Sequence, residues 1–304
     1  MLNFRQTGLA LVIAAINLTA GPTTGTTWTS AGFLDLPKDA EVGAMSAVAV
    51  DRVHGFLYVL HRGGTPLLKF DSKGKYLSGW GQGLFKVPHG LRVDKEGSLW
   101  ITDNGAHNVR KFSPDGTLLT TISEAGGALK SPDDLVIASN GDLYVADTGN
   151  GRIVHLTPEG KFVSQFGAKG KGPGQFTTAH GLAIGADDTV YVADRGNNRV
   201  EVFTSGGKFV AEWNGFGNPY GLLAWRNELF VSEGETHKII ELSNATIGSS
   251  VWSPSGMSQE KIIWVANNAT ISRIWGANKS KNGNEVTVMV AGCVPLVLNA
   301  TNCN

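Results

Sequence analysis

Five segments of this chain align with one another without a gap, and each predicts two β-strands joined by a tight turn. The segments read LYVLHRGGTPLLKF, LWITDNGAHNVRKF, LYVADTGNGRIVHL, VYVADRGNNRVEVF and LFVSEGETHKIIEL, and they end at Phe70, Phe112, Leu156, Phe203 and Leu242. In each one, runs rich in β-branched and aromatic residues flank a turn that contains Gly or Asn, which is the pattern of a β-hairpin. A repeat of this kind restricts the chain to folds in which similar units pack side by side.

A shorter apolar strand precedes each hairpin, as SAVAVD, HGLRVD, DLVIAS, HGLAIG and YGLLAW, and a further strand such as DGTLLTTI follows it. Four short strands in about 45 residues describe one blade of a β-propeller. A sixth unit is predicted in KIIWVANNATISRIW, from Lys261 to Trp275. We therefore predict an all-β protein, a single six-bladed β-propeller over residues 28–290. The segment before the first blade is expected to add a strand to the last one, and residues 291–304 form an irregular tail.

The N-terminus has the pattern of a secretory signal peptide over residues 1–20. Arg5 precedes the apolar run GLALVIAAINLTA, and small residues follow at Ala20 and Gly21, whereas a membrane span needs about 20 apolar residues. An uncleaved anchor is the alternative. We expect a secreted protein, extracellular or periplasmic, in which Cys293 and Cys303 either close one small loop or stay as two thiols. The sequons at Asn244, Asn268, Asn278 and Asn299 would make it a glycoprotein in a eukaryotic secretory pathway.

Charge gives no sign of a polyanionic partner. Lys plus Arg and Asp plus Glu balance at 26 each, and the basic residues form no stripe with aromatic residues, so we expect no nucleic-acid binding and no membrane contact beyond the signal segment. The chain also has no phosphate-binding loop followed by a helix, no Cys-x-x-Cys and no Gly-x-Ser-x-Gly elbow. We expect a monomer.

The repeat predicts which residues converge. The innermost strands of a propeller line a central channel, so residues at the same repeat position lie at the same height around it. His89, Asp133, His180 and Tyr220 share the first such position. A second ring follows the strand-ending aspartate and consists of Arg62, Asn104, Thr148 and Arg195.

Each of these two rings has two alternative interpretations. Two histidines at matched positions suggest a metal such as zinc, with Asp133 as a further ligand; alternatively, each histidine bonds a neighbouring backbone group and fills the channel. The planar guanidinium groups of Arg62 and Arg195 suit a carboxylate ligand; alternatively, they form salt bridges with an aspartate such as Asp194.

Over roughly residues 43–242 the chain resembles the NHL-repeat propellers of the peptidyl-α-hydroxyglycine α-amidating lyase type. The resemblance is carried by LHRGG, VPHGLRVDKEGSLWITDNGAHNVRKF, PDDLVIASNGDLYVAD, GPGQFTTAHGLAIG, YVADRGNNRV and GFGNPYGL. It implies that His89 and His180 are two of three zinc-binding histidines and that Arg62 and Arg195 are active-site arginines. Zinc would polarise the α-hydroxyl group, and the C–N bond of a C-terminal α-hydroxyglycine would break to give a peptide amide and glyoxylate.

The sequence departs from that family at two functional positions. Thr148 and Gly149 stand where the family has its catalytic tyrosine, and WSPSGMSQEKIIWV has no histidine where the third zinc ligand is expected. The family's structural calcium uses a carboxylate near that third histidine in some members. We therefore expect either a zinc-dependent amidating lyase, with Tyr220 helping to bind a peptide or a small carboxylate-bearing substrate, or a non-catalytic NHL propeller that binds a peptide, glycan or protein at the channel mouth.

Overall fold

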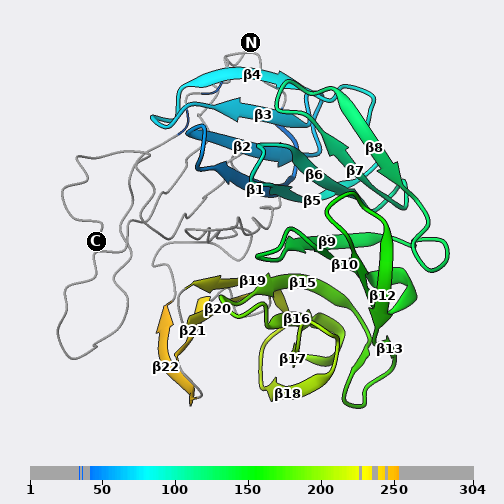
Figure 1. The fold of residues 1–304 in the computed structure, drawn as a ribbon. Helices are drawn as coiled ribbons and strands as arrows, with labels where there is room; N and C mark the ends of the chain where they lie inside the picture. The colour runs from blue at the N-terminus through cyan, green and yellow to red at the C-terminus, as the bar shows by residue number, and fades with distance from the viewer. Residues whose placement is uncertain are drawn as a thin grey trace, which may run out of the picture.

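The computed structural model describes residues 34, 36, 42–225, 228–234, 239–243 and 246–252. The regular secondary structure of this part of the chain is almost entirely β-strand (Figure 1). The predicted signal segment, the predicted sixth unit, the C-terminal tail, both cysteines and the four sequon asparagines lie outside the described residues. Within them, no helix is long and apolar enough to cross a membrane.

The described strands form five four-stranded antiparallel sheets, each made of strands that follow one another in the chain. The first two sheets comprise β1 (Met45–Asp51), β2 (Phe56–His61), β3 (Leu67–Phe70), β4 (Tyr76–Trp80), β5 (Pro88–Val93), β6 (Leu99–Asp103), β7 (Asn108–Phe112) and β8 (Leu118–Ile122). The third and fourth comprise β9 (Pro132–Ile137), β10 (Leu143–Asp147), β11 (Arg152–Leu156), β12 (Phe162–Phe166), β15 (Ala179–Ile184), β16 (Val190–Asp194), β17 (Arg199–Phe203) and β18 (Phe209–Asn214). The fifth comprises β19 (Pro219–Trp225), β20 (Glu228–Glu233), β21 (Ile239–Ser243) and β22 (Thr246–Trp252).

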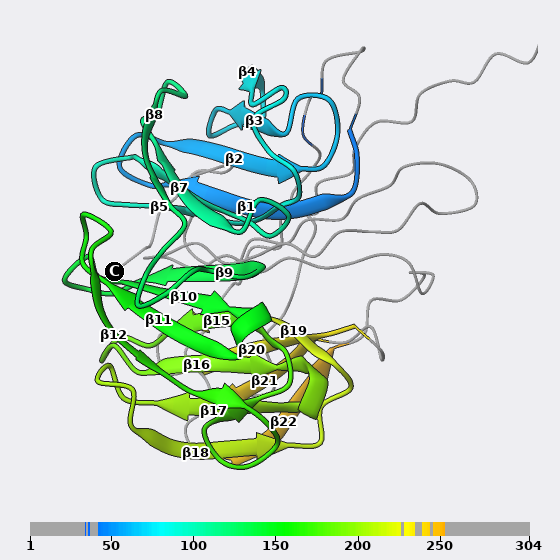
Figure 2. The same ribbon diagram turned by 90° about the vertical axis from the view of Figure 1, so that its right-hand side faces the viewer.

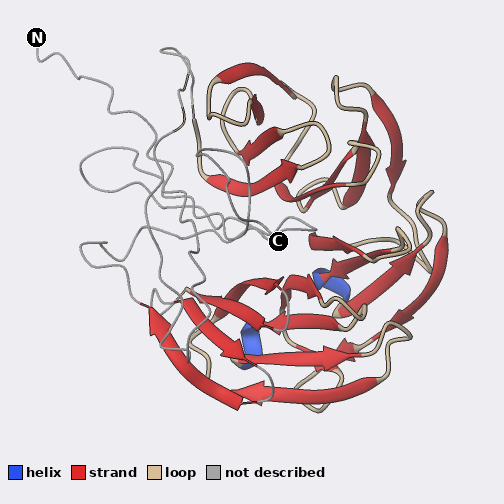
Figure 3. Ribbon diagram, turned by 60° about the vertical axis from the view of Figure 1, so that its left-hand side comes forward, coloured by secondary structure: helices blue, strands red, loops and turns tan. Residues whose placement is uncertain are grey.

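Short elements occupy some of the connections. The two-residue strands β13 (Ala168–Lys169) and β14 (Gln175–Phe176) pair in parallel between the third and fourth sheets. Two 3-10 turns, Thr148–Asn150 and Arg195–Asn197, join the hairpin strands of those sheets and are drawn in blue in Figure 3. Each 3-10 turn ends at a residue with positive φ, Gly151 or Asn198, a conformation that Gly and Asn tolerate.

The five sheets are arranged as the blades of a propeller. Figures 1 and 3 show them following one another along an arc, and Figure 2 shows the same order from the blue first sheet to β18. The first strand of each sheet is the innermost one, and these strands are successive neighbours in the order β1, β5, β9, β15, β19. The all-β fold and the repeated four-stranded unit predicted from the sequence are therefore confirmed, with five blades in the described part of the chain.

The core lies between the blades and holds their faces together. Leu91 and Val93 of β5 and Leu99 and Ile101 of β6 belong to one apolar cluster with the residues of β1, β2 and β3. Leu34, from the segment before the first blade, is buried in the same cluster. Burying such side chains fully stabilises the fold by about 1.5–3 kcal/mol each, so apolar packing contributes strongly to holding neighbouring blades together.

A β-bulge opens each innermost strand. The register with the second strand slips by one residue at the same repeat position in all five sheets. The residues in the bulges are Ser46, His89, Asp133, His180 and Tyr220. Bulges redirect side chains and are frequent beside active sites, so this irregularity points five equivalent side chains to one end of the channel.

The residue that ends each second strand holds the segment leading into the bulge. The Asp103 carboxylate accepts the backbone N–H groups of Lys86 and Val87 at 2.9 and 2.8 Å. The Asp194 carboxylate accepts those of Thr177 and Thr178 at 3.0 and 3.1 Å. These carboxylates therefore fix the backbone just before His89 and His180.

Candidate metal and carboxylate site

Three of the predicted residues meet at one mouth of the channel. His89, Asp133 and His180 come from β5, β9 and β15, and their candidate ligand atoms all lie within 4.8 Å of one another. All three residues are buried, His180 to within 1%. The two imidazole rings meet edge to face, with centroids 5.2 Å apart. The structure thus brings together residues that lie up to 91 positions apart in the chain.

Backbone carbonyls determine which nitrogen of each imidazole carries the proton. His89 Nδ1 lies 3.0 Å from the carbonyl oxygen of Asp133, and His180 Nδ1 lies 3.0 Å from that of Tyr220. A carbonyl only accepts hydrogen bonds, so Nδ1 must be the donor in both residues. In the neutral imidazole, Nε2 then keeps its lone pair, and a second ring nitrogen bonded in this way is typical of metal-binding histidines.

Asp133 is held in place from the preceding blade. The Asn104 side-chain amide donates to its Oδ1, and Thr102 Oγ1 donates to its backbone carbonyl at 2.8 Å. The same Oδ1 lies 3.7 Å from His89 Nε2. Asn104 belongs to the second predicted ring, so the two rings are in direct contact here.

The first arginine, Arg62, reaches across to the second blade. Its Nε donates to the carbonyl oxygen of Pro88 at 3.4 Å, next to His89. Desolvation lowers the pKa of its guanidinium group, and the nearby Asp133 carboxylate opposes this shift. Arg62 is an exposed residue, so its charge is available to a ligand at this mouth.

The second arginine, Arg195, stacks on the fifth blade. Its guanidinium carbon lies 4.8 Å from the centre of the Tyr220 ring, and that ring meets His180 at 90° with centroids 4.9 Å apart. The predicted alternative for Arg195, a salt bridge to Asp194, is not formed, because Asp194 pairs with Arg199 at 3.2 Å. Arg62 thus contacts the residue next to His89, and Arg195 contacts the Tyr220 ring, which in turn meets His180.

The donor set fits a zinc ion. Four tetrahedral ligands at 2.0–2.1 Å from zinc stand roughly 3.3 Å apart, so a contraction of at most about 1.5 Å from the observed 4.8 Å limit would bring the three groups to that spacing. Two neutral imidazoles and a carboxylate are a common catalytic set that leaves a fourth position open. Calcium prefers six to eight oxygen ligands, which this cluster does not offer. The segment that carries the family's third histidine lies outside the described residues.

Other hydroxyl and imidazole side chains bond to neighbouring protein groups. Thr148 Oγ1, at the position of the family's tyrosine, donates to the carbonyl oxygen of Ala179 in the next blade. His54 pairs with Asp51, and His155 pairs with Asp142, each at 2.8 Å. His107 Nδ1 accepts the backbone N–H of Ser131 at 2.9 Å on the surface, whereas His237 lies outside the described residues.

Ser46 completes the ring and was missed in the sequence reasoning. It occupies the bulge of β1, the position that His89 holds in β5. The repeat alignment contained the necessary signal, since SAVAVD aligns with HGLRVD. A serine in an apolar strand is chemically inconspicuous, and only its burial in the structure makes it notable.

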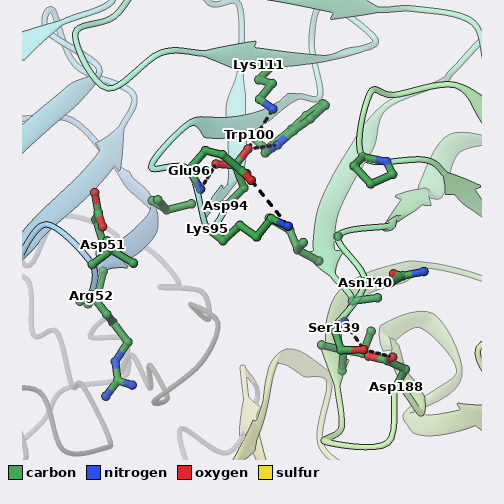
Figure 4. Close-up of a pocket in the computed structure, with 18 of the residues that line it drawn as sticks. Asp51, Arg52, Asp94, Lys95, Glu96, Trp100, Lys111, Ser139, Asn140 and Asp188 are labelled. Carbon is green, nitrogen blue, oxygen red and sulfur yellow. Dashed lines mark hydrogen bonds and ion pairs between the residues drawn. The ribbon is translucent and has the colours of Figure 1, made fainter.

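A cavity of about 890 Å³ opens at the opposite end of the same inner strands (Figure 4). Its lining includes the residues Val50, Val93, Ile137, Ile184 and Ala224, which share one repeat position. The acidic groups at its rim are paired with their neighbours. Asp94 meets Lys111 and the Trp100 indole, and Asp188 meets Ser139. The convergent histidines and arginines therefore mark the other mouth as the candidate site.

Three segments of the chain match the model of the NHL repeat, over residues 85–112, 129–156 and 176–203. Each match runs from the loop before an innermost strand to the end of the third strand of that blade. The chain is 37% identical over 106 residues to NHL repeat-containing protein 3 of Mus musculus, which covers 31% of this chain and 30% of that protein. It is 49% identical over 45 residues to peptidyl-alpha-hydroxyglycine alpha-amidating lyase 2 of Drosophila melanogaster, covering 14% of this chain and 11% of the relative. The chain thus spans less than a third of the length of these relatives.

Solved structures support the fold. A streptogramin B lyase structure superposes with a TM-score of 0.57 at 19% identity, covering 71% of both chains. A chain of a nidogen/laminin complex superposes with a TM-score of 0.63 at 17% identity, covering 81% of this chain and 92% of that one. At such identities the likeness concerns the architecture alone.

Proposed function

We propose that this chain, which carries NHL repeats in three of its described blades, is an amidating lyase that cleaves peptidyl-α-hydroxyglycine into a peptide amide and glyoxylate. The observation that carries this proposal is the meeting of His89, Asp133 and His180 at one channel mouth, with the contacts of Arg62 and Arg195 beside them. A buried metal-binding set beside two cationic forks matches a substrate that carries a hydroxyl group and a carboxylate on the same carbon.

The reaction needs no oxidant. The hydroxyl group loses its proton, its oxygen becomes the aldehyde carbonyl of glyoxylate, and the electron pair of the C–N bond leaves with the nitrogen, which takes up a proton. His89, His180 and Asp133 would hold zinc, which when bound supplies a Lewis acid that favours the ionised hydroxyl group. Arg62 and Arg195 would orient the carboxylate, and the Tyr220 ring would support Arg195 and line the site.

A second candidate function, a non-catalytic binding propeller, is favoured by Thr148. This residue stands at the position of the family's catalytic tyrosine and is engaged with the backbone of Ala179. A chain that keeps the carboxylate-binding arginines without the catalytic tyrosine would bind a peptide terminus and leave it intact.

Glyoxylate release separates the two functions. Purified protein is incubated with zinc and N-benzoyl-α-hydroxyglycine, and glyoxylate is measured against a zinc-only control. We expect release by the wild type and a loss of more than about 100-fold in His180→Ala, because removing a metal ligand costs at least as much as removing its hydrogen-bonding support. His107→Asn is the matched control, since Asn tolerates the positive φ at position 107. If glyoxylate stays at the level of the zinc-only control even at high protein concentration, the lyase proposal is wrong and the non-catalytic binding propeller remains.

A further inference from the structure

We propose that Ser46 is a further substrate-binding residue, whose hydroxyl group hydrogen-bonds the amide next to the α-hydroxyglycine. This assignment rests on the proposed function, because it concerns the same mouth. It starts from the position of Ser46 in the bulge of β1, where the register with β2 slips between Met45 and Ala47. The same bulge in β5, β9 and β15 carries the three residues of the metal-binding cluster.

Ser46 is buried without satisfying its hydrogen-bonding group. The residue is 5% exposed, and its Oγ has no hydrogen-bond partner within the described part of the chain. Other hydroxyl groups on the hairpin side of this mouth bond the backbone: Thr102 Oγ1 donates to Asp133, Thr148 Oγ1 to Ala179 and Ser232 Oγ to Gly221. Burying an unpaired hydroxyl group is unfavourable, so one at the repeat position that holds the candidate metal-binding residues points to a bond made with a ligand.

When the other polar groups of the proposed substrate are assigned to their binding residues, one group remains for Ser46. The carboxylate matches the arginines, and the α-hydroxyl group matches the metal-binding cluster. The amide is the remaining polar group, and it offers a C=O acceptor and an N–H donor, both of which a serine hydroxyl group can satisfy. Ser46 also lies close to Arg62 along the first blade, because the Arg62 backbone N–H donates to the carbonyl oxygen of Ala44 at 2.9 Å.

Two ligands of equal length test this contact by binding alone. N-benzoylglycine carries the amide and the carboxylate, whereas 4-phenylbutanoate carries the carboxylate without the amide. We expect Ser46→Ala to weaken N-benzoylglycine binding by about three- to tenfold, the effect of one hydrogen bond, and to change 4-phenylbutanoate binding by less than about twofold. Isothermal titration calorimetry on the zinc-loaded protein measures both affinities.

Ser232→Ala is the matched control, because the Ser232 hydroxyl group already has backbone partners. It should lower the Tm and affect both ligands equally, whereas Ser46→Ala should leave the Tm unchanged or raise it. Equal effects of Ser46→Ala on the two ligands, or a lowered Tm with both affinities unchanged, would overturn the assignment.

These experiments distinguish a failure of the proposed lyase function from a failure of the proposed Ser46 contact. If the wild type binds N-benzoylglycine with this dependence on Ser46 but releases no glyoxylate, the contact stands and the lyase activity is wrong. If glyoxylate is released and Ser46→Ala changes neither affinity nor turnover, the lyase stands and the contact is wrong. If the wild type binds neither ligand, the Ser46 contact is wrong, and glyoxylate release then decides the lyase alone.

Discussion

The residue that ends the second strand of each described blade accepts backbone N–H groups, although the type of side chain differs between blades. Asp103, Asp147, Asp194 and Glu233 accept backbone N–H groups there. In the first blade His61 takes this place, and its Nδ1 accepts the N–H groups of Gly43 and Gly63 at 3.3 and 2.9 Å. A protonated Nδ1 cannot accept these bonds. The fold therefore requires the neutral form of His61.

This requirement predicts a pH dependence of stability. Burial lowers the pKa of His61 to about 4, and the Thr65 backbone opposes the shift. The folded-state pKa lies below the ordinary value of about 6.5, so the stabilisation is complete above pH 6.5 and is lost as the pH falls towards 4. We expect the wild type to lose about 2–3 kcal/mol more than His61→Asn between pH 7 and pH 4.5, measured by urea unfolding. Parallel losses in both proteins would contradict this origin.

The two arginines at the channel mouth should contribute less to stability, and more to ligand binding, than an arginine buried in an ion pair. Arg62→Ala and Arg195→Ala should change the free energy of unfolding by less than about 1 kcal/mol, yet weaken carboxylate binding by about 1.5–3 kcal/mol. Lysine should restore binding poorly, because a point charge does not reproduce the bidentate fork. Arg199→Ala is the control. It leaves Asp194 and Glu201 buried without their partner and should cost about 3–5 kcal/mol. Unfolding of Arg62→Ala or Arg195→Ala at much lower urea, with ligand affinity unchanged, would make these arginines structural.

At the scale of the element, neighbouring innermost strands approach closely where the site is built. A Cβ atom at Gly181 would lie 2.2 Å from the carbonyl oxygen of Tyr220, and one at Gly90 would lie 3.0 Å from that of Asp133. These two carbonyls are the ones that accept the Nδ1 protons of His180 and His89. The absence of a side chain at these glycines thus allows the strand contacts that orient both imidazoles.

Gly181→Ala tests this dependence on strand spacing. The added methyl group must push β19 away from β15, which should destabilise the protein by about 1–3 kcal/mol and weaken zinc binding through the displaced His180. Gly206→Ala serves as the control, because the nearest atom to its added Cβ lies 3.8 Å away. Thermal unfolding and zinc titration measure the two effects. A Gly181→Ala protein with unchanged stability and zinc affinity would show that the strands separate without cost.

At the scale of the whole molecule, the mouth joins blades that the chain visits in succession. The second, third and fourth blades each contribute one member of the candidate metal-binding cluster, and the first and fourth contribute the arginines. A bound ion would therefore add a connection between blades that already meet through apolar packing and through hydrogen bonds such as that from Thr102 to Asp133. Ligands that bind only the folded state stabilise it by RT ln(1 + L/Kd), where L is the ligand concentration, so the effect grows with the logarithm of ligand concentration.

Zinc should accordingly stabilise the propeller. Protein purified without chelator is expected to hold about one zinc per chain, and zinc at about 100 times its Kd should add about 2.7 kcal/mol of stability. His89→Ala and His180→Ala should lose most of the metal and of this stabilisation. Elemental analysis and thermal unfolding with and without chelator test both expectations. A wild type that contains no transition metal and unfolds at the same temperature with and without zinc would exclude a metal site.

Much of the fold and part of the site could be predicted from the repeat. Aligning five hairpins placed His89, Asp133, His180 and Tyr220 at one channel position, and the bulges of the structure confirm that equivalence. The ion pairs of Asp147 with Arg152 and of Asp194 with Arg199 lie at the same repeat position in the third and fourth blades. Ser46 was missed although SAVAVD aligns with HGLRVD, because the burial of its hydroxyl group appears only in the structure.

The sequence by itself determined the blade architecture, since a period of about 45 residues with strand, turn and strand in each unit has few other solutions. It also determined which residues are equivalent, because register along a strand follows from the alternation of side chains. Only the tertiary structure decided which partner each group takes. Asp194 pairs with Arg199 and leaves Arg195 to stack on Tyr220, and the Nδ1 atoms of His89 and His180 face carbonyls of the next blade. The contacts of Arg195, His89 and His180 cross between blades, and their geometry depends on how closely neighbouring strands pack, a distance that no single strand encodes.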